Sequence, residues 1–282
     1  MFARLLHRPP LVAMLLGLLG CAHSPRLGTA DLCDLPSAPE ILEQSPTELH
    51  QVWDVAESPR FLQPVPADAI DPILATYQQA VRARTDVDPL GLIRRQRGVF
   101  LASQNPALHA ETRVSGALLD GKIGQLGAIS CLDMRLWAVQ ATRRPMLTEP
   151  SEFTAFVLRG RSPARSRLRI YFSSFPRSGG RMNQTVRARV DADLGAGYVL
   201  MAHLHNHPFL FDRVVGDASW TRADTKDDIA GAVPPSVTDL QYYSGLLDEA
   251  GLQSVRITNG FITLMQSPAE IRTLSAAGRA SP

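Results

Sequence analysis

In the segment His203-Leu204-His205-Asn206-His207-Pro208, the residues up to His207 end a longer run, residues 198–207. This run has the length and apolar content of a β-strand. Side chains alternate along a strand, so His205 and His207 point to the same face and present two neutral nitrogen donors side by side. Further along, Ser236-Val237-Thr238-Asp239 opens a predicted helix, and Asp239 can supply an oxygen ligand. Zn²⁺ takes such donors in a tetrahedron, and three protein ligands leave one position for water, as in catalytic zinc sites.

The residues around this segment predict a mixed α/β fold. Alternating or continuous apolar residues predict strands at residues 122–130, 153–158, 167–172, 186–190 and 198–207. Leu132, Leu136 and Val139 mark one face of a helix. Ser236 is a suitable N-cap for a further helix, which runs to about residue 250 and stops at a glycine.

The C-terminal residues predict a hairpin and a last helix. Asn259-Gly260 is typical of a tight turn, here between strands at residues 254–258 and 261–265. The helix that follows is expected at residues 268–274.

Two helices are expected before this domain, at residues 67–84 and 90–102, the first marked by apolar residues three and four positions apart. We therefore divide the chain into a helical segment (residues 65–110) and a main domain (residues 111–282) with an insertion at residues 209–235. Residues 21–64 are rich in Pro, Ser and Glu, which predicts an extended tether or a loosely packed arm.

Residues 1–20 have the pattern of a secretory signal peptide, because a basic start precedes an apolar run, residues 11–19, that is too short to span a bilayer. Leu18-Leu19-Gly20-Cys21 resembles a bacterial lipobox, which implies that Cys21 is lipidated and anchors the chain to a membrane. By resemblance to the sorting of enterobacterial lipoproteins, Ala22 directly after it favours the outer membrane of the cell envelope, and the inner membrane stays open as the alternative. The alternative is an ordinary signal peptide with a cysteine near its end by chance.

Composition and cysteine count narrow the expected partners and compartment. With 45% apolar and 20% charged residues the chain is expected to be globular, and a net charge of +2 gives no reason to expect nucleic acid as a partner. Besides Cys21 the chain has Cys33 and Cys131, and an oxidising compartment would allow a disulfide between these two. The alternative is two unpaired thiols.

The spacing of the chemical groups resembles one known family. His205-x-His207-Pro208, then Ser236-x-x-Asp239, and an upstream glutamate that begins a strand are together similar to the JAMM metalloproteases, also called MPN or JAB domains. Glu152 fits the glutamate, because a small residue and a glycine follow it at the family's spacing. Glu149 is the alternative at that position.

This resemblance covers about residues 111–282 and implies a mixed β-sheet flanked by helices. It implies that His205, His207 and Asp239 hold zinc, which lowers the pKa of a bound water to about 7. Glu152 would then be the general base, and Ser236 would hydrogen-bond the oxyanion of the tetrahedral intermediate.

Two features leave alternatives open. The insertion at residues 209–235 is longer than the family's spacing, so it is either a lid over the substrate or a surface insertion, and one of its aspartates could replace Asp239. These are Asp212, Asp217, Asp224, Asp227 and Asp228. His203 shares a face with His205 and His207, and we expect it to support or pack against the ligands rather than to be one.

The sequence therefore predicts a zinc-dependent hydrolase of peptide or isopeptide amide bonds, lipid-anchored in the bacterial cell envelope, with a peptide or protein as substrate. The rival interpretation is a catalytically silent envelope lipoprotein that uses the same fold as a protein-binding module.

Overall fold

The computed structural model describes residues 33, 35, 38–102, 106–121, 123–160, 166–176, 183–210 and 231–279. The predicted signal peptide, the lipidation site Cys21 and most of the insertion, with its five aspartates, lie outside the described residues. Within the described part of the chain, no helix has both the length and the apolar character that crossing a membrane requires.

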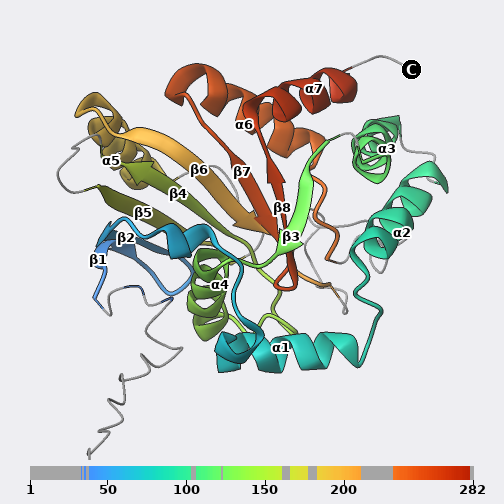
Figure 1. Cartoon of the computed structure of the whole chain (residues 1–282), viewed down its shortest axis with the longest axis horizontal. Helices are drawn as coiled ribbons and strands as arrows, with labels where there is room; N and C mark the ends of the chain where they lie inside the picture. The colour runs from blue at the N-terminus through green and yellow to red at the C-terminus, as the bar shows by residue number, and fades with distance from the viewer. Residues whose placement is uncertain are drawn as a thin grey trace, which may run out of the picture.

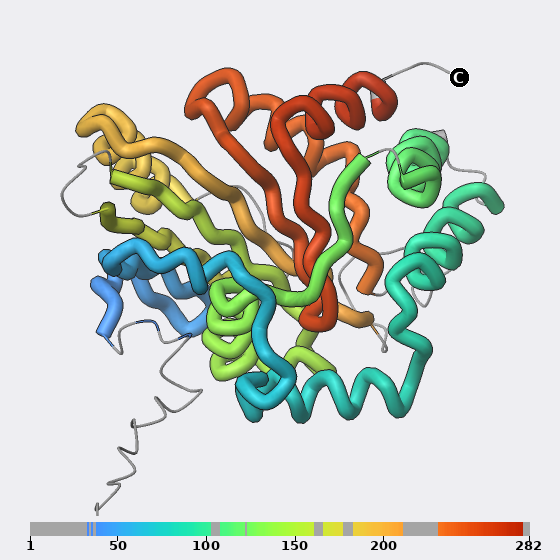
Figure 2. Tube along the Cα trace, viewed as in Figure 1, coloured from blue at the N-terminus to red at the C-terminus, as the bar shows by residue number. Residues whose placement is uncertain are grey.

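In the described part of the chain, eight strands form one mixed sheet, which agrees with the predicted α/β class. They are β1 (Glu40–Gln44), β2 (Leu49–Ala56), β3 (Gln125–Ala128), β4 (Phe153–Arg159), β5 (Arg167–Ser174), β6 (Val199–Asn206), β7 (Val255–Thr258) and β8 (Ile262–Gln266). Their order across the sheet is β1-β2-β5-β4-β6-β7-β8-β3 (Figure 1). β6 and β7 are parallel, and the other neighbouring strands pair antiparallel. The N-terminal β1 and β2 lie at one edge, and β3 forms the opposite edge (Figure 2).

Helices cover both faces of this sheet. The α-helices are α1 (Pro72–Arg82), α2 (Pro89–Ala102), α3 (Pro106–Leu119), α4 (Cys131–Arg143), α5 (Gln184–Gly195), α6 (Val237–Ala250) and α7 (Pro268–Arg279), with short 3₁₀ helices η2 (Pro59–Leu62) and η3 (Ala67–Ala69). α1 and α4 pack on one face, and α3, α5, α6 and α7 contribute to the core on the other. α2 lies against α3, beyond the β3 edge (Figure 1).

The alternation of side chains along β4 explains why the sheet needs both helical layers. Phe153, Ala155 and Val157 belong to the core under α1 and α4, whereas Phe156 and Leu158 belong to the core under α5 and α6. All five side chains are fully buried. Burying a large apolar side chain stabilises the fold by about 1.5–3 kcal/mol, so a central strand of this composition has to be covered on both sides.

The local signals at the C-terminal end of the chain are confirmed. The Ser236 hydroxyl accepts the N–H of Asp239 at 3.1 Å and caps α6, and Gly251 ends the helix with φ of 64°. In the β7–β8 turn, the Asn259 side chain accepts the N–H groups of Phe261 and Ile262, at 2.9 and 3.1 Å.

The prediction of a tether over residues 21–64 is wrong for its second half. β2 lies inside the sheet and pairs with β5 along its whole length, and β1 pairs with β2. Val52, Trp53 and Val55 are buried, but Asp54 between them, the polar His50 and Gln51 before them and prolines further out on either side hide the strand pattern in the sequence. Residues before the main domain are therefore part of its sheet.

Two helices also differ from the prediction. The strand expected at residues 186–190 is wrong, because this segment belongs to α5. Val186 and Val190 alternate with polar residues as in a strand, but they are also four residues apart and share the buried face of a helix. α3 was not predicted as a separate helix, and it carries the helical segment beyond its expected end, residue 110, to Leu119.

A disulfide joins Cys33 to Cys131, the pairing expected from the cysteine count. It links the segment before β1 to the first turn of α4, across a sequence separation of 98 residues. The nearby Arg135 adds a second link, since its Nε donates to the Cys33 carbonyl at 3.0 Å.

Removing this disulfide is expected to destabilise the protein. A bridge that closes a loop of this length stabilises a fold by about 2–5 kcal/mol, mainly by restricting the unfolded chain. Urea unfolding of the oxidised protein and of the Cys33→Ser/Cys131→Ser variant measures the difference. An unchanged unfolding midpoint, with the bridge verified by mass in the parent protein, would contradict this.

A buried ion pair connects α4 to β7. Asp133 accepts hydrogen bonds from Arg256 Nη2 at 2.7 Å and from the Thr263 hydroxyl at 2.9 Å. Ser130, the N-cap of α4, also donates its N–H and its hydroxyl to Asp133. Burial alone would raise the pKa of Asp133, but the charge and hydrogen bonds of Arg256 and Ser130 outweigh it and hold the pKa below its usual value.

We expect Asp133→Asn to lower the free energy of unfolding by about 3–5 kcal/mol at pH 7, because the variant leaves Arg256 buried without its counter-ion. Because folding lowers the pKa of Asp133, its ionised carboxylate adds to the free energy of unfolding at pH values above the unfolded pKa, about 3.9. This contribution is lost as the pH falls from there through the lowered pKa of the folded state. The free energy of unfolding of Asp133→Asn should therefore fall less than that of the parent protein as the pH is lowered through this range.

The matched control is Asp248→Asn, which breaks the exposed pair between Asp248 and Arg272. Its effect should stay below about 1 kcal/mol. Equal decreases in the free energy of unfolding of Asp133→Asn and Asp248→Asn, measured by chemical unfolding, would contradict a larger contribution from the buried pair.

Candidate metal centre

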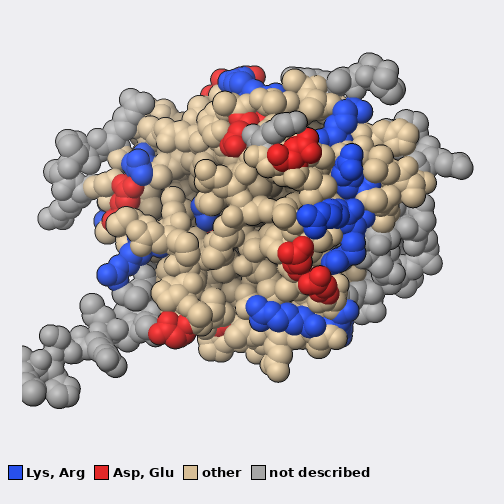
Figure 3. Space-filling model, turned by 45° about the vertical axis from the view of Figure 1, so that its right-hand side comes forward, with Lys and Arg blue, Asp and Glu red and all other residues tan. Residues whose placement is uncertain are grey.

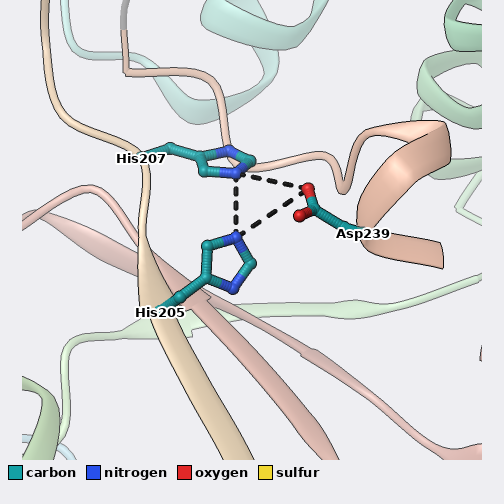
Figure 4. Close-up of side chains that lie close together, drawn as sticks. All are labelled: His205, His207 and Asp239. Carbon is teal, nitrogen blue, oxygen red and sulfur yellow. Dashed lines mark hydrogen bonds and ion pairs between the residues drawn. The ribbon is translucent and has the colours of Figure 1, made fainter. Parts of the chain in front are cut away.

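Two histidines at the C-terminal end of β6 form one side of the candidate site (Figure 4). His205 lies in the strand and His207 directly after its end, and their Nε2 atoms are 3.0 Å apart. β6 is held between β4 and β7, and the N–H of His207 continues the pairing by donating to the Thr258 carbonyl at 2.9 Å. The sheet therefore fixes the backbone that carries both imidazoles.

Asp239 completes the group from the first turn of α6. Its Oδ2 lies 3.9 Å from Nε2 of His205 and 3.7 Å from Nε2 of His207. The same oxygen accepts the N–H and the hydroxyl of Ser236, both at 2.8 Å, so the N-cap of the helix also orients the carboxylate. The hydrogen of the Ser236 hydroxyl is thus directed at Asp239.

The spacing of these three atoms fits a tetrahedral metal ion. Zinc ligands at about 2.0–2.2 Å from the ion are about 3.3–3.6 Å apart in a tetrahedron. The observed separations of 3.0, 3.7 and 3.9 Å bracket that range. Among the described residues, His205, His207 and Asp239 are the group of side chains placed to hold a metal ion.

The charges at this site depend on burial and on mutual contact. Burial lowers the pKa of His205 far below its ordinary value, so this imidazole is neutral. For His207, burial is outweighed by the hydrogen bond and charge of Asp239, with a further contribution from Glu152, which raise the pKa to about 8. The pKa of Asp239 is below its usual range, because the two histidines and the Ser236 N–H outweigh the effect of burial.

Each histidine has a hydrogen-bond partner on its other ring nitrogen, which is typical of metal ligands. Nδ1 of His207 donates to the Ala232 carbonyl at 2.8 Å, and Nδ1 of His205 lies 2.8 Å from the hydroxyl of Tyr243. Neither partner was expected from the sequence. The position of Tyr243, four residues after Asp239 on α6, was a usable signal, because residues four apart share a helix face.

Glu152 lies next to the ligand group without belonging to it. Glu152 comes directly before β4, two residues ahead of Thr154, where the antiparallel pairing with β6 ends opposite His205. The charge of Glu152 contributes to the raised pKa of His207, which places the carboxylate near that imidazole. Glu149, the alternative, is exposed and lies 3.7 Å from Arg144.

A further carboxyl group, missed by the sequence analysis, approaches from α3. Both oxygens of Glu111 accept the N–H of Val237, at 3.0 and 3.1 Å, at the first residue of α6. Burial raises the pKa of Glu111 to about 7, against the effect of the Val237 hydrogen bond, and the charge of Asp239 adds to the rise. No local sequence signal marks Glu111, because only packing of α3 on α6 brings it there.

His203 lies one step back along β6 and is not part of the ligand group. Its side chain is buried against Phe156, Tyr242 and Tyr243, and burial lowers its pKa to about 4. Neither ring nitrogen has a hydrogen-bond partner among the described residues. This agrees with the expectation of a packed or supporting histidine.

No match to this chain is found among models of protein families, curated proteins or solved structures. The structure therefore assigns a site, two imidazoles and a carboxylate that could hold a metal ion, but no family.

We expect the protein to bind one divalent metal ion at this site. Asp239→Asn should weaken zinc binding on the order of 100-fold or more, since loss of an outer hydrogen-bond partner alone typically costs about 10–100-fold. The amide oxygen of this variant can still accept from the Ser236 N–H, so the cap of α6 is retained. Competition with a chromophoric chelator measures the affinity.

The matched control for zinc binding is His109→Ala, which removes an exposed imidazole on α3. It should bind zinc as tightly as the parent protein. Equal affinities in the parent, Asp239→Asn and His109→Ala would mean that zinc binds elsewhere.

Proposed function

We propose that this protein is a zinc-dependent hydrolase of peptide or isopeptide amide bonds. The observation that carries the proposal is the convergence of His205 Nε2, His207 Nε2 and Asp239 Oδ2 at separations that suit a tetrahedral ion. Two nitrogens and one carboxylate oxygen are the donor set of open, catalytic zinc sites. Zinc, when bound there, supplies a Lewis acid that makes a water nucleophilic near neutral pH.

Glu152 is the general base in this proposal. Its place directly before β4, and the effect of its charge on the pKa of His207, put a carboxylate near the ligand group. From there it takes a proton from the attacking water and passes it to the nitrogen of the leaving amine. Ser236 orients Asp239 in the resting state, and its hydroxyl would stabilise the oxyanion after turning from the carboxylate toward the substrate.

The order of elements supports a JAMM-like domain over residues 111–282. A strand (β3), a helix (α4), a strand led by Glu152 (β4), the histidine strand (β6), a helix led by Asp239 (α6) and a hairpin (β7–β8) follow one another as in that family. β1 and β2 on the far side of β5, together with β5 and α5 between β4 and β6, are elements of this chain that lie outside that order.

The substrate we propose is a peptide or protein of the bacterial cell envelope, reached by an enzyme anchored through a lipid on Cys21. The face drawn in Figure 3 carries acidic groups beside its Lys and Arg side chains. A surface of mixed sign suits a polypeptide better than the uniformly negative backbone of a nucleic acid.

Glu152→Gln tests the proposed mechanism. The amide keeps the size of the side chain but cannot take a proton, so hydrolysis of unfolded casein or of a peptide branched at a lysine Nε should fall about 10²–10⁴-fold. Zinc content, measured by elemental analysis, should stay at the parent level, because Glu152 is outside the ligand group.

Glu149→Gln is the matched control, since Glu149 is three residues away, exposed and next to Arg144. It should retain full activity. A parent protein that purifies without zinc at neutral pH would contradict the proposal and favour the silent binding module, and so would a zinc-loaded protein that cleaves neither substrate.

A further inference from the structure

The residue between the two candidate histidine ligands has different surroundings. Side chains alternate along β6, so Asn206 points to the face of the sheet opposite to that of His205. Its side chain is fully buried. The amide group of Asn206 therefore needs hydrogen-bond partners within the protein.

Both partners of this amide belong to the segment that carries Glu152. Oδ1 of Asn206 accepts the N–H of Phe153 at 2.7 Å, and Nδ2 donates to the Ser151 carbonyl at 3.0 Å. A backbone N–H can only donate and a carbonyl can only accept, so the two partners determine which end of the amide is the oxygen. Asn206 thus binds the residue before Glu152 and the residue after it.

These two hydrogen bonds restrict the backbone conformation of Glu152. The Ser151 carbonyl is part of the peptide plane before Glu152, and the Phe153 N–H is part of the plane after it. The angles φ and ψ of a residue are the rotations that relate its two flanking planes. One side chain that binds both planes therefore restricts both angles, and with them the direction of the Cα–Cβ bond of Glu152.

Gln140 of α4 adds contacts to the same segment. Its Nε2 donates to the Ser151 hydroxyl at 2.7 Å and to the Glu152 carbonyl at 3.3 Å, and its side chain is fully buried. The Glu152 carbonyl also accepts the N–H of Phe175 at 3.2 Å. The segment before β4 is therefore held from β6, from α4 and from the residue that follows β5.

This arrangement connects the proposed general base to the candidate ligands through one strand. The backbone of β6 that presents His205 and His207 also carries the Asn206 amide, so it sets the place of Glu152 relative to both imidazoles. The charge of Glu152 acts on His207, which agrees with a carboxylate near the ligand group. Position matters for such a base, because a misplacement of about 1 Å can cost about 100-fold in rate.

We propose that Asn206 is a positioning residue for Glu152, and that Gln140 supports it from α4. The inference rests on the proposed function, because Glu152 is the general base of that reaction. Asn206 acts here through the backbone of Glu152 and without contact with substrate or metal. A residue that only stabilised the fold would change the free energy of unfolding and leave the work of Glu152 unaffected.

The test measures hydrolysis of the lysine-branched peptide by Asn206→Ala and by Gln140→Met in the full, zinc-loaded chain. We expect kcat to fall about 10–100-fold in Asn206→Ala and about 3–10-fold in Gln140→Met, which keeps the side-chain volume but loses the donor. KM and zinc content should match those of the parent protein, because neither residue belongs to the ligand group. Gln140→Met decides the question if Asn206→Ala does not fold.

Combining each variant with Glu152→Gln separates positioning from stability. Without a carboxylate at residue 152 there is no base to position. Asn206→Ala should therefore lower the residual rate of Glu152→Gln by no more than about twofold. A purely structural role predicts instead that the two losses multiply.

The matched control is Gln96→Ala, which removes another buried amide. Gln96 accepts the hydroxyl of Ser115 at 3.3 Å between α2 and α3. Unfolding midpoints are expected to fall in this variant as in Asn206→Ala, but its kcat should stay within about twofold of the parent value.

Amide hydrogen exchange tests the contact itself, independently of any activity. The N–H of Phe153 should exchange faster in Asn206→Ala than in the parent protein, relative to the N–H groups of Ala155 and Val157 in the same strand. An unchanged relative rate at Phe153 would overturn the hydrogen bond on which the inference depends.

The other outcomes separate this inference from the proposed function. If the parent protein hydrolyses the peptide and kcat is unchanged in Asn206→Ala and Gln140→Met, the positioning role alone is overturned. Losses that multiply in combination with Glu152→Gln also overturn it. A zinc-loaded parent protein that hydrolyses neither the peptide nor casein overturns the proposed function, and the role of Asn206 with it.

Discussion

The position of β6 inside the sheet is the constraint on which the candidate site depends. Antiparallel β4 on one side and parallel β7 on the other fix its backbone, so His205 and His207 stay on one face with their Nε2 atoms in contact. Glu152 directly precedes β4, and its charge acts on His207. Because β6 and β7 are parallel, the chain has to cross over between them, and α6 lies in that crossover with Asp239 in its first turn. The carboxyl ends of strands in such crossovers are common places for binding sites.

One local motif serves two purposes in this structure. α4 and α6 both begin with a serine cap and an aspartate three residues later, and in both the serine accepts the aspartate N–H while the aspartate accepts the serine N–H. At α4 the carboxylate of Asp133 accepts hydrogen bonds from Arg256 and Thr263, which joins this helix to β7 and β8 inside the core. At α6 the carboxylate of Asp239 meets two imidazoles. The packing partner, and not the motif, decides whether the carboxylate forms a buried ion pair or lies beside two imidazoles with which it could hold a metal ion.

The acidic groups around the imidazoles explain the electrostatics of the site. Burial, with a smaller contribution from the charge of Asp239, raises the pKa of Glu111. Asp239 also lies close to the two histidines, and the charge of Glu152 acts on His207. A half-buried group of this kind concentrates negative charge in a region of low dielectric, which favours a cation. A divalent ion would offset this charge and replace the proton that His207 gains in the metal-free protein.

The sequence by itself determined the local features. The strand that carries the histidines, the Ser236 cap, the Gly251 stop and the Asn259-Gly260 turn follow from short-range rules and occur as predicted. Only the tertiary structure decided which distant groups meet. Val186 and Val190 fit a strand or a helix equally well, and β2 is a strand because β5 pairs with it. Glu111 and Tyr243 reach the site through the packing of α3 and α6. Such contacts depend on long-range burial and hydrogen bonding, which periodicity and caps along the chain do not encode.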